Sequence, residues 1–134
     1  MATILAHLQV KPGAEASFEQ TISGLFEMSH ASEPALRRYE YWRAQTPGHY
    51  YCLLAFDDFM GFMAHQCSAY HEAAVEPLMG QIEQMRLEWV DPVQGAAPLP
   101  TTRAQRVPES ATELVKKYAE MMPVSEADWW LPLR

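Results

Sequence analysis

The stretch "ALRRYEYWRAQTPGHYYCLLAF", residues 35–56, carries the clearest structural signal in the sequence. Its first ten residues alternate, so that Tyr39, Tyr41 and Arg43 share one face, and a period of two is typical of a strand. "QTPG" is a turn, and "HYYCLLAF" is rich in residues that favour strands. We therefore predict a β-hairpin over this stretch.

Strands are also predicted near both ends of the first 93 residues. "TILAHLQV", residues 3–10, alternates in the same way, and "MRLEWVDPV", residues 85–93, predicts a last strand. Between the first strand and the hairpin, residues 14–30 place apolar side chains at helical spacing. "ASEP" ends that helix, because the residue before Pro34 resists helical dihedral angles.

A second helical region lies between the hairpin and the last strand, in "FMGFMAHQC" and "AYHEAAVEPLMGQI". "DD" before it offers an N-cap, and Ser68 is placed to cap its second half. The element order is then β-α-β-β-α-β. This order predicts an α+β, ferredoxin-like fold, with helices on one face of an antiparallel sheet.

The other face of the sheet is predicted to be too apolar to remain in water. It would carry Leu5, His7, Trp42, Tyr51 and Leu53. A second copy of the same sheet is the simplest cover, so we expect a symmetric homodimer with sheet-to-sheet packing.

The chain divides into a domain of residues 1–93 and an extension of residues 94–134. The extension starts with a linker without periodicity, residues 94–108, and continues with an amphipathic helix in "ESATELVKKYAEMM". It ends with "PVSEADWWLPLR". We expect this tail, with Trp129 and Trp130, to dock on the body or on the partner subunit.

Composition argues against several classes of function. The formal net charge is −7 over 134 residues, which disfavours binding to nucleic acid or to an anionic membrane. No apolar run approaches the roughly 20 residues that span a bilayer. The first residues lack the pattern of a signal peptide, so we expect a cytoplasmic protein. Its two cysteines, Cys52 and Cys67, are expected to be free thiols.

The segment "FMAHQCSAYHEAA", residues 62–74, concentrates reactive side chains and admits three interpretations. His65 and His71 are six residues apart, on different faces of a continuous helix, and no third ligand is spaced to join them. We predict no metal. Cys67 with His71 has the spacing of a nucleophile and base, but the neighbouring glutamates supply the wrong charge for a thiolate.

The third interpretation is one wall of an aromatic cleft. Phe62 and His65 would face the sheet, opposite the face of the hairpin that carries these side chains: Tyr39, Tyr41, Arg43, Tyr50, Cys52, Leu54 and Phe56. Such a cleft suits a flat organic ligand. The same spacing also fits a plain hydrophobic core, and both interpretations stay open.

Several short motifs together resemble the antibiotic biosynthesis monooxygenase family. They are "VKPG" after the first strand, "RYEYWR" in the second, "AFDD" at the end of the third and "AHQCSAYH" in the second helical region. The resemblance covers about residues 3–93. It implies a dimeric α/β barrel, in agreement with the fold predicted above.

The resemblance also implies an activity. The family's best understood members oxidise polycyclic phenols to quinones with molecular oxygen, without metal or flavin, so no cofactor is expected. It suggests Arg43 as the partner of a phenolate, Phe56 and Phe62 as aromatic walls, and Tyr70 or His71 as a proton relay. His65 falls on a frequent family histidine that can be structural.

The sequence departs from its relatives at three positions. Cys52 replaces an amide side chain of some quinone-forming members, which leaves the positioning of oxygen open. Ala6 and His65 differ from the residues used by related heme-degrading enzymes, which argues against heme. Two alternatives therefore remain: an isomerase or cyclase in which His65, His71 or Tyr70 is the acid or base, and a protein that only binds a small molecule.

Overall fold

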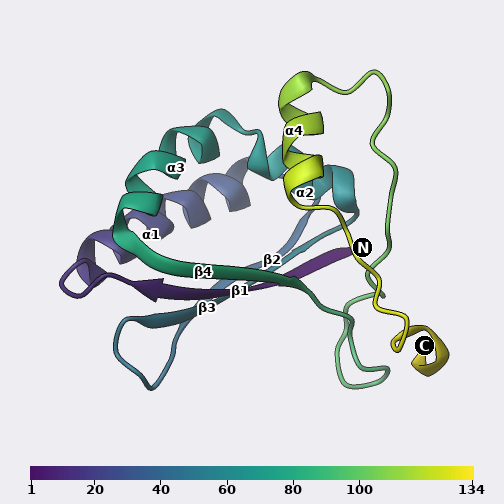
Figure 1. The fold of residues 1–134 in the computed structure, drawn as a ribbon, viewed down its shortest axis with the longest axis horizontal. Coiled ribbons are helices and arrows are strands. Elements are labelled where there is room, and N and C mark those ends of the chain that lie inside the picture. The colour runs from purple at the N-terminus through teal and green to yellow at the C-terminus, as the bar shows by residue number, and fades with distance from the viewer.

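A computed structural model describes residues 1–134 as one antiparallel sheet with helices on one face (Figure 1). The strands are β1 (Ala2–Val10), β2 (Leu36–Arg43), β3 (His49–Phe56) and β4 (Ile82–Trp89). The helices are α1 (Glu15–Ser32), α2 (Phe59–Gln66), α3 (Ala69–Gln81) and α4 (Glu113–Met121), with a short 3₁₀ helix at Leu131–Leu133. The strand order is β2-β3-β1-β4, which confirms the ferredoxin-like prediction.

The pairing of the strands assigns side chains to the two faces of the sheet as predicted. Ile4 lies opposite Leu54, and Leu54 lies opposite Tyr39, so these three side chains point toward the helices. The side chains of the neighbouring positions point the other way, so His7, Tyr51 and Trp42 share the opposite face of the sheet. A period of two fixes this division, because successive side chains of a strand alternate.

Both predicted caps are present. The Asp58 carboxylate accepts a hydrogen bond from the Gly61 N–H at 2.8 Å and begins α2. The Ser68 hydroxyl accepts one from the His71 N–H at 3.3 Å and begins α3. Ser68 therefore divides the second helical region into two helices, because its extended backbone interrupts the helical ladder.

The last strand lies three residues earlier than predicted. β4 begins at Ile82, directly after α3, and ends at Trp89. Ile82 is buried opposite Val10, so packing against β1 extends the strand toward α3. Pro92 provides no amide hydrogen for the ladder, and the chain leaves the sheet before it.

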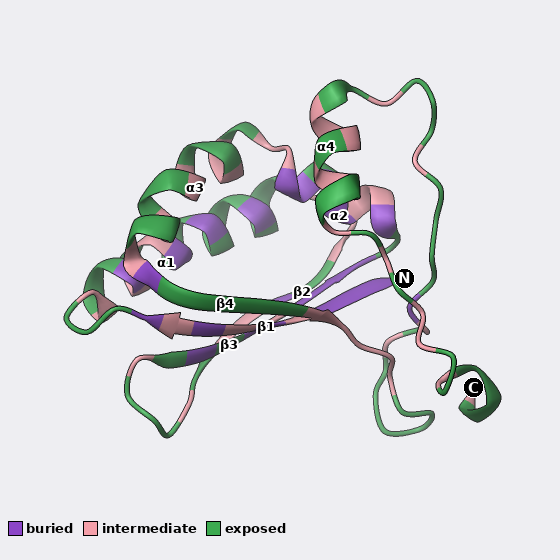
Figure 2. Cartoon of the chain, viewed as in Figure 1, coloured by how far each residue is buried: buried purple, intermediate pink, exposed green.

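The core fills the space between the helices and the sheet (Figure 2). Phe18 of α1 and Phe62 and Met63 of α2 pack with Phe56 and Cys52 of β3. All five side chains are buried. The sheet's other face has no helical cover: Trp42 is 61% exposed and Tyr51 is 42% exposed.

The extension after β4 is tied to the body at both termini. Arg103 N–H donates to Met1 O at 2.9 Å, and α4 then packs against α2. The Arg134 guanidinium bonds the Asp91 and Glu126 carboxylates at 2.6–3.0 Å, while Trp129 is 69% exposed. None of the helices combines the length and the apolar character that crossing a membrane requires.

Candidate functional site

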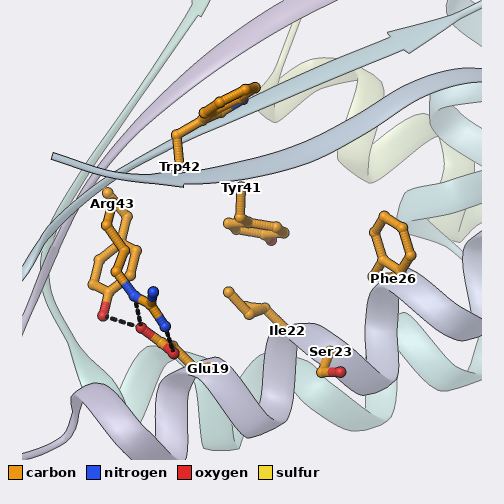
Figure 3. Close-up of a pocket in the computed structure, with 8 residues that line it drawn as sticks. Glu19, Ile22, Ser23, Phe26, Tyr41, Trp42 and Arg43 are labelled. Atoms are coloured by element: carbon orange, nitrogen blue, oxygen red, sulfur yellow. Dashed lines mark hydrogen bonds and ion pairs between the residues drawn. The ribbon is translucent and has the colours of Figure 1, made fainter.

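A pocket of about 460 Å³ lies between α1 and the edge strand β2 (Figure 3). The Tyr41 ring lies over Ile22, with Phe26 at one side and the charged groups at the other. The Trp42 ring points to the other side of the strand. The lining residues are Glu19, Ile22, Ser23, Phe26, Tyr41, Trp42, Arg43 and Tyr50. The pocket thus combines apolar and aromatic walls with one polar end.

Arg43, Glu19 and Tyr50 form the polar end. Arg43 donates from Nε and Nη2 to the two Glu19 oxygens at 2.7 and 2.6 Å, and the Tyr50 hydroxyl donates to Glu19 Oε1 at 2.8 Å. The hydrogen bonds from Arg43 and then Tyr50 lower the pKa of Glu19 to about 2. Glu19 is therefore a carboxylate at neutral pH, and it is too weak a base to take the proton of a phenol.

Arg43 keeps hydrogen-bonding capacity in this arrangement. A guanidinium has five N–H donors, and the two bonds to Glu19 use two of them. In Figure 3 its third nitrogen carries no interaction with the residues drawn. Arg43 is also well exposed, so a ligand in the pocket can reach it. The polar end can therefore bind an oxygen atom of a ligand while Glu19 holds the guanidinium in position.

Four of the predicted ligand contacts lie in the core instead. Tyr39, Cys52 and Phe56 are buried and do not border the pocket. Phe62 is also buried and borders a separate cavity beside β4. Burial raises the pKa of Cys52 to about 12, so its thiol stays protonated. Of the predicted site residues, Tyr41 and Arg43 line the α1–β2 pocket, together with Tyr50 from the predicted cleft face.

His65 and Tyr70 belong to a third group, a buried network at the end of α1. His65 Nδ1 lies 2.8 Å from Glu33 Oε1, and the Tyr70 hydroxyl donates to the same carboxylate. Ser29 Oγ lies 3.4 Å from His65 Nδ1. The His65 side chain is 1% exposed. The network joins α1 to α2 and α3, and the His65 carbonyl also accepts from Ser68 Oγ at 2.8 Å.

The break at Ser68 brings the two histidines together. The ring centroids of His65 and His71 are 4.8 Å apart, which a continuous helix would not allow. Burial, and then the proximity of His65, lower the pKa of His71 to about 4, and its Nδ1 is buried without a hydrogen-bond partner. No three His, Cys, Asp or Glu side chains are arranged to hold a metal ion.

The structure therefore divides the predicted site among the α1–β2 pocket, the core and the buried network. The sequence reasoning missed two acidic residues, Glu19 and Glu33, which bind the predicted Arg43 and His65. Glu19 lies three residues before the core residue Ile22, on a neighbouring part of the helix surface, so helical spacing was the available signal. Glu33 gave no such signal, because it follows the helix end.

Solved structures share this fold. A candidate antibiotic biosynthesis monooxygenase from Caulobacter crescentus is 25% identical, with 69% of this chain and 90% of that chain covered at a TM-score of 0.65. One from Bacteroides thetaiotaomicron is 14% identical (78% and 95% covered, TM-score 0.67). One from Nitrosomonas europaea is 16% identical (69% and 99% covered, TM-score 0.64). The last two show the fold alone.

No curated protein matches the chain. The family model for antibiotic biosynthesis monooxygenases matches residues 1–77, which is more than half of the 134 residues. This match extends from β1 into α3 and confirms the resemblance found in the sequence motifs. The chain belongs to the antibiotic biosynthesis monooxygenase family.

Proposed function

We propose that this protein oxygenates a flat phenolic compound with molecular oxygen and without a cofactor, in the α1–β2 pocket. The observation that carries the proposal is the Arg43 guanidinium, held by Glu19 at one end of a pocket with aromatic walls. Family membership supports an oxygenase in general, and the pocket supports a phenol as substrate.

The substrate ring would lie against Tyr41, with its hydroxyl toward Arg43. Burial raises the pKa of Tyr41, so this side chain stays neutral and offers an uncharged ring face. A guanidinium beside a phenol favours the phenolate, because opposite charges within about 4–6 Å stabilise the ionised form. The electron-rich phenolate then reacts with oxygen.

The overall reaction balances without an added reductant. A phenol and O₂ give a quinone and water: one oxygen atom enters the ring, and the other leaves as water with two hydrogens of the substrate. The four electrons that O₂ accepts come from the ring. Arg43 contributes by stabilising the negative charge of the phenolate with a donor whose position Glu19 already fixes.

The test is oxygen uptake with chelator-treated protein and a small panel of anthrone- and hydroquinone-type phenols. We expect uptake that Arg43→Ala abolishes and Arg43→Lys restores in part, because lysine keeps the charge but loses the planar fork. Arg38→Ala is the matched control on the same strand, since Arg38 points to the sheet's other face and pairs with Glu40. Equal loss with Arg38→Ala would contradict the proposal.

Two other outcomes correspond to the alternative functions. A product of unchanged mass, formed without oxygen uptake, would indicate an isomerase or cyclase. That activity requires access of the ligand to the buried His65, Tyr70 and His71 network. Tight binding of ring compounds without any turnover would indicate a binding protein, and Arg43→Ala would then have little effect on apolar ligands.

We also propose that two copies associate through the sheet face opposite the helices. Trp42 and Tyr51 expose aromatic surface there, beside the half-buried Leu5 and Leu53. Light scattering should give twice the chain mass, and Trp42→Glu should give the monomer mass. Met28→Glu, which changes an exposed side chain of α1 on the helix side of the sheet, is the control. A monomeric wild type would overturn this proposal.

A further inference from the structure

A second cavity, of about 400 Å³, lies at the opposite edge of the sheet from the α1–β2 pocket. It is bounded by β4, α2 and the residues that end α4. The lining residues that matter here are Phe62, Met85, Leu87, Trp89, Met121 and Met122. Because β2 and β4 are the two edge strands, the two pockets are separated by the width of the sheet.

One wall of this cavity is formed by the extension. Pro123 O accepts a hydrogen bond from Trp89 Nε1 at 2.9 Å, and Met122 Sδ accepts one from Gln66 Nε2 at 3.4 Å. The Tyr118 hydroxyl donates to Glu72 and joins α4 to α3. Figure 1 shows α4 beside α2, on the helix side of the sheet. The family model stops at residue 77, so it includes neither β4 nor this wall.

The cavity presents no free charge to a ligand. Glu88 is the one acidic lining residue, and its carboxylate is bonded to His7 at 2.8 Å and Arg86 at 2.5 Å. The only polar atom of the Trp89 side chain is used by Pro123. Phe62 and Trp89 stand perpendicular with ring centroids 5.6 Å apart. The walls therefore favour an uncharged molecule with ring character.

Apolar surface is left in water here, although it lies on the helix-covered face of the sheet. Leu87 pairs with the buried Ala6 yet is 38% exposed, and Met85 pairs with the buried Leu8 yet is 46% exposed. Met121, across the cavity, is 64% exposed. Exposed apolar surface around a concavity is typical of a ligand site. A molecule seated between Met85, Leu87 and Met121 would remove it from water.

We propose that this cavity, the β4–α4 pocket, binds an uncharged, flat ring compound. Its volume lies in the range of small-molecule sites, which is about 300–1,000 Å³. Methionine side chains are flexible and polarisable, so Met85, Met121 and Met122 can adapt to a ring edge. The proposal does not depend on oxygenation in the α1–β2 pocket, since the two pockets share no lining residue.

The test uses the full-length chain labelled with ¹³C at the methionine methyl groups, titrated with the neutral probe N-phenyl-1-naphthylamine. The chain has eight methionines, and the NMR signal of each methyl group reports on its own surroundings. We expect saturable shifts of Met85, Met121 and Met122 with one dissociation constant, and none at Met28 and Met79, which are exposed on α1 and α3.

Two variants complete the test. Met121→Glu places a carboxylate at the opening and should weaken binding roughly tenfold or more, because the site offers no partner for a charge. Met79→Glu, a matched exposed methionine near the end of α3, should change the dissociation constant less than about twofold. Absent shifts, shifts confined to other methionines, or equal weakening by both variants would overturn the proposal.

Discussion

Replacing His71 by glutamine should remove much of the loss of stability that the protein suffers in mild acid. The pKa of His71 is about 4 in the folded chain, against an ordinary value of 6.5, because burial and the neighbouring His65 disfavour its charged form. His71 Nδ1 is also buried without a partner. Glutamine retains a polar side chain of similar reach but takes no proton.

The direction in which the free energy of unfolding changes with pH follows from proton binding. Between pH 6.5 and pH 4 the unfolded chain holds a proton on residue 71 and the folded chain does not, so acid favours unfolding. The contribution of His71 to the free energy of unfolding is fully present above pH 6.5 and is lost as the pH falls toward 4. Each pH unit corresponds to about 1.4 kcal/mol, so the whole interval gives about 3 kcal/mol of unfolding free energy.

The assay is urea unfolding of the wild type and the variant at several pH values from 4 to 8, at constant ionic strength. Other titrating groups near His71 are His65, Glu33 and Glu72, and all are retained in the variant. The difference between the two curves therefore reports residue 71. His49→Gln, at the exposed first residue of β3, is the control and should not change the dependence of stability on pH. Parallel curves for wild type and His71→Gln would refute the reasoning.

Four further substitutions test the packing and the ion pairs. Gly61→Ala should destabilise the fold by about 1–3 kcal/mol in urea unfolding, since the added Cβ would lie 2.7 Å from a side-chain carbon. Gly24→Ala should stabilise the fold by about 0.5–1 kcal/mol, since the added Cβ meets nothing within 4 Å and alanine favours the helix. Glu33→Gln should cost about 2 kcal/mol in the same assay, because it removes the charged acceptor of the buried network, and no loss would contradict that role. Arg134→Ala should speed proteolytic cleavage of residues 123–134, because it leaves Asp91 without its ion-pair partner and Glu126 with only the longer ion pair to Arg103 at 3.7 Å. An unchanged rate would contradict this role of Arg134.

Much of the fold was predictable because its signals are local. The hairpin of residues 35–56 contains an alternating segment and a segment rich in strand-forming residues around a Pro-Gly turn, and both strands form where predicted. Asp58 and Ser68 cap the helices that they precede, since a short polar side chain can satisfy the first free amides of a helix. The start of β4 was misplaced by three residues, because packing against β1 decides where that strand begins.

The site was only partly predictable. The alternation of side chains along the second strand placed Tyr41 and Arg43 on the helix side of the sheet, and both line the α1–β2 pocket. The same alternation also placed Cys52 and Phe56 on the helix side of the sheet, but these two residues are buried in the core. A face assignment does not tell a core position from a pocket position, since that depends on which helix covers which strand and how closely.

The sequence by itself determined the element order, the two faces of the sheet and the family, because each depends on residue types at short spacing. The tertiary structure alone decided the partners of the charged groups. Arg43 meets Glu19 across 24 residues, and His65 meets Glu33 across 32. It also decided that the extension completes a cavity over β4. Such contacts depend on how distant segments pack together, and no local pattern encodes that arrangement.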